Sequence, residues 1–172
     1  ISNFAGSGTA YSFTLTPIAN GTFSARAAAG VFTDAAGNTN TASSTLSRTA
    51  DLTAPTITLA SSAAAIVRGA ITVTSTLSET SVNFAAVDVT PVNATVSGFT
   101  GSGTAYSFTL TPIADGAFSA NVSAATFPDA AGNNNTASNV LSRTADLIAP
   151  GITLSSIAGE PVTGPITVTA TL

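Results

Sequence analysis

The charged residues of this chain are few, and their types limit the chemistry it can perform. Of 172 residues, eight are Asp or Glu and four are Arg, so 7% of the chain is charged, against about 25% for an average soluble domain. The sequence has no Lys, His or Cys. A Ser-His-Asp triad, a thiol nucleophile, a Schiff base and a tetrahedral zinc site therefore each lack an essential residue. Carboxylates remain, which suit acid–base chemistry or the binding of a hard cation.

Other classes of function are disfavoured by the same composition. Glu79 and Asp88 are the best pair of acids for glycoside hydrolysis, but the chain has no Trp and only two Tyr to build a sugar-binding cleft. The net charge is -4 and the Arg residues are scattered, so no basic stripe would bind nucleic acid. No apolar run approaches the ~18 residues of a membrane helix. We therefore expect no enzymatic activity, no nucleic-acid partner and no membrane insertion.

An internal repeat organises the chain. When residues 1–77 are placed over residues 96–172 without a gap, 53 of the 77 positions are identical, at an offset of 95 residues. The stretch GSGTAYSFTLTPIANG begins at Gly6 and returns, with one change, at Gly101. The chain is thus one repeat unit read about 1.8 times (172/95), as in tandem-repeat proteins.

Two proline-containing segments divide this repeat. ADLTAP ends at Pro55 and ADLIAP ends at Pro150, and the residue before a proline is pushed toward extended geometry, as in a linker. We therefore expect residues 54–149 to form a complete unit. Residues 1–53 would be the C-terminal part of a preceding repeat, and residues 150–172 the N-terminal strands of a following one. On this interpretation the chain is a window in a longer array.

Apolar residues alternate with Thr and Ser along the unit, which predicts β-strands. The alternation is found in TITL from Thr56, ITVT from Ile71, YSFTLT from Tyr106 and FSANVSA from Phe118. Weaker signals at Val87, Val89 and Val96 predict two more strands, interrupted by Pro91, and Val140 with the residues after it predicts the last. Thr on the outer face favours strands and stays wettable. About seven short strands in 95 residues predict an all-β, immunoglobulin-like antiparallel sandwich. A closed barrel is the second choice, and a β-solenoid lacks the short period it needs.

Several short motifs run through the unit. They are Ser78-Glu79, Phe84–Val89, Gly101-Ser102-Gly103, Tyr106–Pro112, Asp115-Gly116, Asp129–Asn133 and the linker 145–150. Together they resemble the bacterial Ig-like domains of very large surface adhesins and biofilm-associated proteins. The resemblance covers the whole chain, because the partial repeats carry the same motifs. It implies a rod of tandem domains that holds a binding region away from a bacterial cell, with an extracellular or cell-surface location.

The resemblance also implies calcium at the junctions between domains. In an Ig-like sandwich the N-terminal linker and two loops meet at one pole, which would bring together Asp51, Glu79 and Asp129. Asn133 would lie close by, and Asp88 would stand at the start of the third strand. The equivalent positions in the partial repeats are Asp34, Asn38 and Asp146. Ca²⁺ takes six to eight oxygen ligands, several of them carboxylates, so these residues are the candidate ligands.

Simpler interpretations stand beside this one. Asp129–Asn133 also suits a tight turn, in which Asp and Asn bond to nearby backbone and Gly takes a positive φ. Asp51 would then cap a linker amide, and Arg48 or Arg143 would pair with the linker carboxylates. Asp115 and Asn20 share one repeat position before Gly, which predicts a turn and not a ligand.

The leading functional hypothesis is therefore a non-catalytic structural segment of a surface or secreted adhesin, in contact mainly with neighbouring repeats. Two alternatives remain open. One is a subunit of a self-assembling filament, in which strands are exchanged between copies of the chain. The other is a module that binds a glycan or a protein, although exposed aromatic and Arg residues are scarce.

Overall fold

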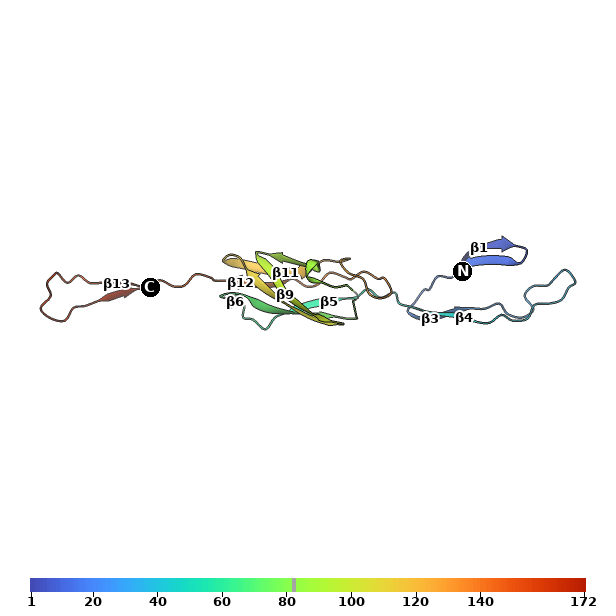
Figure 1. Ribbon diagram of the computed structural model, residues 1–172, viewed down its shortest axis with the longest axis horizontal. Helices are drawn as coiled ribbons and strands as arrows, with labels where there is room; N and C mark the ends of the chain where they lie inside the picture. The colour runs from blue at the N-terminus through green and yellow to red at the C-terminus, as the bar shows by residue number, and fades with distance from the viewer. Residues whose placement is uncertain (82) are drawn as a thin grey trace.

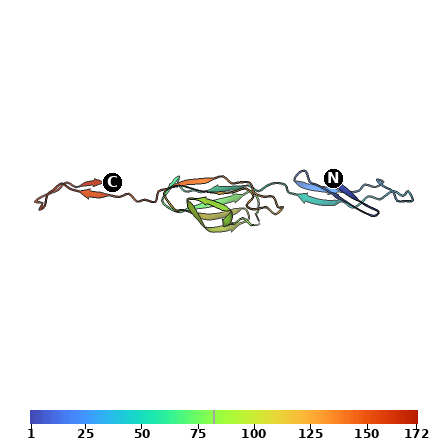
Figure 2. The same ribbon diagram turned by 90° about the horizontal axis from the view of Figure 1, so that it is seen from above.

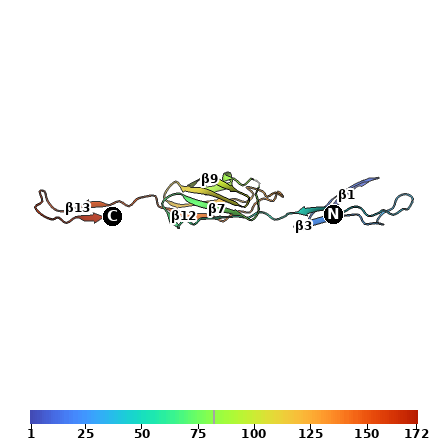
Figure 3. The same cartoon turned by 60° about the horizontal axis from the view of Figure 1, so that its bottom comes forward.

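The chain forms an extended row of three parts. The computed structural model describes residues 1–81 and 83–172. Figure 1 shows a central sandwich flanked by N-terminal hairpins on one side and a C-terminal hairpin on the other, and Figures 2 and 3 show the same row from other directions. The N-terminal part contains β1 (Ser2–Ser7), β2 (Ala10–Thr14), β3 (Gly21–Ala25) and β4 (Leu46–Ala50). The C-terminal part contains β13 (Thr153–Ser155) and β14 (Thr169–Thr171).

The first sheet of the central sandwich has four antiparallel strands in the order β5-β7-β10-β9. These strands are β5 (Ile57–Ala60), β7 (Ile71–Leu77), β9 (Ala94–Ser102) and β10 (Ala105–Pro112). Alternate residues of β7 are buried and the Thr residues between them are exposed, which is the pattern expected of a half-buried strand. The end of β9, where it pairs with the start of β10, requires Gly101, because its φ is 126° and an added Cβ would lie 2.4 Å from the carbonyl oxygen of Ala105.

The second sheet faces the first and has the order β6-β12-β11-β8. Its strands are β6 (Ile66–Val67), β8 (Val89–Val92), β11 (Gly116–Val122) and β12 (Leu141–Ala145). β6 runs parallel to β12, whereas the other pairs are antiparallel. The two strand orders are those of a constant-type immunoglobulin sandwich, with the short β6 added beside the last strand. The predicted all-β sandwich is confirmed.

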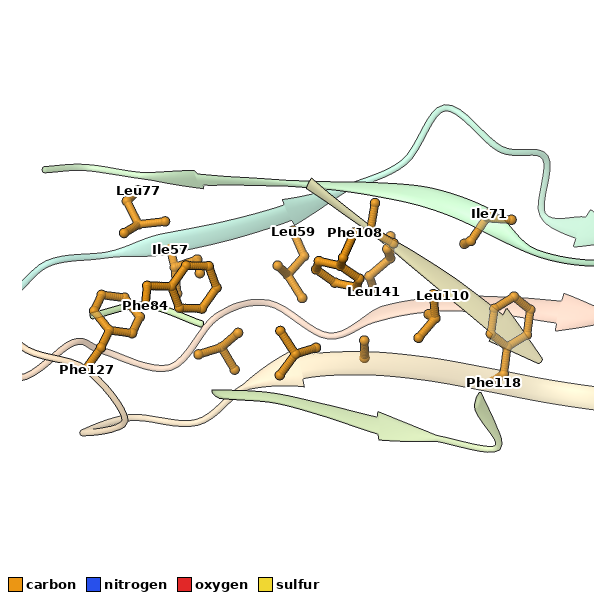
Figure 4. Close-up of a cluster of buried hydrophobic side chains, with 14 of the residues drawn as sticks. Ile57, Leu59, Ile71, Leu77, Phe84, Phe108, Leu110, Phe118, Phe127 and Leu141 are labelled. Atoms are coloured by element: carbon orange, nitrogen blue, oxygen red, sulfur yellow. The ribbon is translucent and has the colours of Figure 1, made fainter. Parts of the chain in front are cut away.

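The core lies between these sheets (Figure 4). Its largest fully buried side chains include Phe108 from the first sheet, Phe118 from the second and Phe127 from the loop after β11. The rings of Phe84 and Phe127 lie 5.0 Å apart and close the core at that end. Aromatic residues dominate a small core because each buries a large apolar area.

Three local features differ from the prediction. Val87 is not part of a strand: it lies in a short 3₁₀ helix, Ala86–Asp88, and its side chain is exposed. Pro91 does not interrupt a strand but lies within β8, which is an edge strand, where a missing N–H is tolerated. β6 was not predicted, because the residues before it are mostly Ala and show no alternation.

Ser75, in the middle of β7, carries an unpaired hydroxyl. The residue is buried, and its Oγ has no hydrogen-bond partner among the residues that the structure describes. The equivalent position in the C-terminal part is Ala170 (75 + 95). We expect Ser75→Ala to raise the free energy of unfolding by about 1 kcal/mol, because burying an unpaired hydroxyl costs about 1–3 kcal/mol. Urea denaturation of the two proteins measures the change, and a lower stability of the variant would contradict the prediction.

Candidate metal centre at the interdomain linker

The loop between β11 and β12 places Asp129 in a tightly bonded turn. Asp129 Oδ1 accepts hydrogen bonds from the backbone N–H of Ala131 (2.8 Å) and of Asn133 (2.9 Å), and Oδ2 accepts one from Asn133 Nδ2 (2.8 Å). An antiparallel bridge between Ser81 and Asp129 ties this loop to the segment that follows β7. The bond from the Asn133 side chain is the main reason that the pKa of Asp129 lies below its ordinary value.

The N-terminal part contains the same turn around Asp34, for which no bridge like the one between Ser81 and Asp129 is found among the described residues. Asp34 Oδ1 accepts bonds from the N–H of Ala36 and Asn38, each at 2.9 Å, and Asp34 Oδ2 accepts one from Asn38 Nδ2 at 2.9 Å. The pKa of Asp34 is lowered, with the Asn38 side chain again the largest cause. The turn is therefore encoded by its own five residues, so the turn interpretation of this motif is confirmed in both copies.

Two further acids approach Asp129 from other elements. Asp51 lies in the linker between β4 and β5, and Glu79 follows the end of β7 by two residues. One carboxylate oxygen from each of Asp51, Glu79 and Asp129 lies within 4.8 Å of the other two. Asn133 Nδ2 donates to the backbone carbonyl of Asp51 at 3.1 Å, so the loop also contacts the linker directly. We call these three acids the junction cluster.

The junction cluster is a group of like charges. Partial burial raises the pKa of Glu79 above its ordinary value, and the negative charges of Asp51 and Asp129 raise it further. Arg143, which was a possible partner of the linker carboxylates, instead donates to the backbone carbonyls of Ala63 (3.1 Å) and Ser61 (3.0 Å). Arg48 likewise donates to the carbonyl of its neighbour Ser47.

The remaining candidate residues lie outside this cluster. Asp88 ends the 3₁₀ helix, and its Oδ2 accepts a hydrogen bond from the N–H of Ala85 at 2.8 Å. It caps that helix and is not brought to the other three acids, which corrects its place among the expected ligands. Asp146 lies in the second linker, where its Oδ1 accepts from the N–H of Ile148 at 3.3 Å.

The linker is also bonded to the part that precedes it, a feature the sequence did not reveal. Asn20 Oδ1 accepts from the N–H of Leu52 at 2.6 Å, and Asn20 Nδ2 donates to Thr53 Oγ1. Asp115 repeats the first of these bonds in the second linker, with Leu147 as donor at 2.6 Å. The shared position before Gly is therefore a turn, as predicted, but its side chain also binds the linker. The sequence feature that could have indicated this linker contact is the polar residue found at this position in both copies of the repeat, Asn20 and Asp115.

The donor set fits a calcium ion. All three side chains of the junction cluster offer carboxylate oxygens, and Ca²⁺ prefers oxygen ligands with several carboxylates among them. The charged form of Glu79 is disfavoured first by partial burial and then by the charges of Asp51 and Asp129, which together raise its pKa, and a bound cation would favour that charged form. Asp51, Glu79 and Asp129 would hold the ion, with backbone carbonyls and water to complete the shell.

Residues 51–145 match the family described as the bacterial Ig-like domain. The chain belongs to this family. The match is 95 residues long (145 − 51 + 1), which equals the repeat offset, and begins at the linker acid of the junction cluster. No curated protein and no solved structure gives a match to the chain. The predicted resemblance is thereby confirmed.

Bacterial Ig-like domains occur in surface and extracellular proteins, and the family is typically non-catalytic. Among the residues that the structure describes, no helix is both long and apolar enough to cross a bilayer. The chain is thus a structural module of the kind found in bacterial surface proteins.

Proposed function

We propose that the chain is a spacer segment of a bacterial surface adhesin, in which tandem Ig-like units extend a binding region from the cell and calcium stiffens each junction. The observation that carries this proposal is the junction cluster. Its three acids come from a linker and from two loops of the sandwich that follows it. An ion bound by all three would therefore fix the linker to that sandwich.

The same linker is held on its other side, which gives the ion a mechanical role. Asn20, in the turn between β2 and β3, binds Leu52 and Thr53 of this linker, whereas Asn133 and the loop acids Glu79 and Asp129 belong to the central sandwich. Without a cation the repulsion between Asp51 and the two loop acids favours opening of this junction. A divalent cation reverses the sign of that interaction, so one ion couples the two parts.

Thermal unfolding of the full chain with excess calcium or with EGTA tests the calcium site. At calcium about one hundredfold above its Kd, we expect the Tm to rise on the order of 10 °C for a sandwich of this size. The extended arrangement seen in Figure 1 supports the spacer role separately. An equal Tm in both solutions would overturn the calcium site.

Glu79→Gln sharpens this test, because the sign of its effect should depend on calcium. In EGTA the variant should match or exceed the natural chain in Tm, since one of three repelling charges is removed. With calcium the variant should gain much less than the natural chain, because a charged ligand is lost. Asp115→Asn is the matched control: Asn20 makes the equivalent linker bond in the first copy, so its calcium gain should be unchanged.

The pH dependence of stability in EGTA gives a second readout. The pKa of Glu79 is raised in the folded chain, so its contribution to stability is present below the unfolded-state pKa and is lost as pH rises through the folded-state value. The lowered pKa of Asp129 acts in the opposite direction, and its contribution is lost as pH falls through its folded-state value. We expect Glu79→Gln to remove only the decline on the rising side. An identical pH profile in the variant would contradict the unfavourable surroundings, partial burial and two neighbouring carboxylates, that raise the pKa of Glu79.

A further inference from the structure

We propose that Asn20 is a site of spontaneous deamidation, and that its contact with the first linker sets the rate of this reaction. This goes beyond the spacer role, which involves no covalent change in the chain. Asn is a chemically labile residue, and Asn20 is the only Asn in the sequence that is followed by Gly. It lies in the turn between β2 and β3, where its side chain is exposed to water.

The reaction needs only Asn20, the residue after it and water. The backbone nitrogen of Gly21 attacks Cγ of Asn20, so that an N–Cγ bond forms and the Cγ–Nδ2 bond breaks. The amide proton of Gly21 leaves with Nδ2 as ammonia. Water then opens the resulting cyclic imide, at one carbonyl to give Asp and at the other to give isoaspartate. Gly favours the attack because it has no Cβ to obstruct the approach of the preceding side chain.

The first linker holds the amide group that must react. Asn20 Oδ1 accepts a hydrogen bond from the N–H of Leu52 at 2.6 Å, and Asn20 Nδ2 donates to Oγ1 of Thr53. The carbonyl oxygen and the leaving nitrogen are both bonded to another segment, which restrains the rotation that brings Cγ to the nitrogen of Gly21. Deamidation therefore takes place when the linker contact opens, and its rate follows the fraction of open contacts.

The second copy of the repeat shows that this turn accommodates the Asp product. Asp115 stands at the equivalent position, also before a Gly, and its Oδ1 accepts from the N–H of Leu147 at 2.6 Å. Asp at position 20 would keep the bond to Leu52 in the same way. Asp115 belongs to the complete central sandwich and is exposed as well. The exposure of the turn and its linker contact are thus properties of the repeat unit.

Thr53 distinguishes the linker that holds an amide from the linker that holds a carboxylate. Its equivalent in the second linker is Ile148 (53 + 95), which has no hydroxyl group. The Asn side chain is therefore found where a hydroxyl partner is present, and Asp115 is found where that partner is absent. Removing the hydroxyl of Thr53 would release Nδ2 of Asn20 and leave the bond to Leu52 in place.

Peptide mapping of the full chain after incubation in mildly alkaline buffer tests the site. Tryptic cleavage after Arg26 releases residues 1–26, and fragment masses show whether NH₂ has been replaced by OH at Asn20. We expect Asn20 to react faster than every other Asn. Its reaction should be at least ~10-fold slower in the folded chain than in concentrated urea, because two hydrogen bonds restrain it.

Asn134 is the internal comparison for this measurement. It is exposed like Asn20, but the next residue, Asn135, carries a side chain and its backbone N–H donates to the carbonyl of Phe127 at 2.9 Å. Asn134 should therefore react more slowly than Asn20 in the folded chain. Equal rates at the two residues, or equal rates for Asn20 in buffer and in urea, would overturn the proposal.

Thr53→Val tests the role of the linker contact. In buffer its Asn20 should deamidate about fivefold faster than that of the natural chain, the factor that one ordinary hydrogen bond contributes. In urea the two chains should react equally. Thr49→Val is the matched control, because Thr49 is exposed on β4 and the side-chain bonds of Asn20 go to Leu52 and Thr53. The Tm of the central sandwich checks that both variants fold. An unchanged rate in Thr53→Val, or the same acceleration in both variants, would overturn the proposal.

Discussion

Replacing Phe108 by Ala is expected to lower the free energy of unfolding of the central sandwich by about 3–5 kcal/mol, the usual cost of removing a buried ring. Phe108 is 1% exposed and lies between the two sheets (Figure 4). The loss is a large part of the 5–15 kcal/mol that stabilises a typical domain. Urea denaturation followed by circular dichroism measures it.

The repeat provides a matched control for this prediction. Phe13 occupies the same repeat position but is 44% exposed, in a part that lacks the facing strands. For dilute chain, Phe13→Ala should therefore change the stability of the central sandwich by less than about 0.5 kcal/mol. The pair also tests the domain boundaries, because residues 54–149 were predicted to fold as the complete unit. Equal losses from the two variants would contradict that boundary.

Asn135→Ala should be nearly as damaging, at about 3–5 kcal/mol. Asn135 is buried, and its Oδ1 accepts hydrogen bonds from the N–H of Thr126 (2.8 Å) and Phe127 (3.0 Å). Its Nδ2 donates to the carbonyls of Ser123 and Thr136, each at 2.8 Å. Truncation leaves four backbone groups without these partners, and each unsatisfied buried group costs about 1–3 kcal/mol, partly recovered through water.

The loop that Asn135 holds also carries Asp129, so this variant should lose calcium stabilisation together with basal stability. Asn40 makes the equivalent four bonds in the exposed N-terminal part. Asn40→Ala should therefore leave both the central stability and the calcium response unchanged. Denaturation and calcium titration of the two variants separate these effects. A normal calcium response in a destabilised Asn135→Ala would contradict the positioning role of the loop.

Much of the fold could be predicted from the alternation of apolar and polar residues, which recurs in several segments of the chain. The alternation around Ile71, Phe108 and Phe118 predicts which residues point inward, because a strand turns successive side chains to opposite faces. Those predictions agree with the observed burial. What the patterns miss is short or local: β6 is two residues long, and Val87 is drawn into a 3₁₀ turn that Asp88 caps.

The candidate site was less accessible to sequence reasoning. Asp51, Glu79 and Asp129 come together because the sandwich topology brings a linker and two loops to one pole, which the resemblance supplied. Asp88 is adjacent in sequence to the start of β8, but its carboxylate has a closer partner in the N–H of Ala85. Sequence alone does not show whether a carboxylate will accept a hydrogen bond from a nearby backbone N–H or will join a more distant group of acids. The buried role of Asn135 was also missed, because it stands in a run of three Asn residues.

The parallel pairing of β6 with β12 has a consequence for a chain that is pulled from both ends. β6 lies near the beginning of the central sandwich and β12 at its end, and the bonds from Thr144 and Asp146 join them. Tension along the row pulls these two strands past each other, so their hydrogen bonds are sheared together and do not open one at a time. The sandwich therefore opposes stretching at the point where the second linker begins.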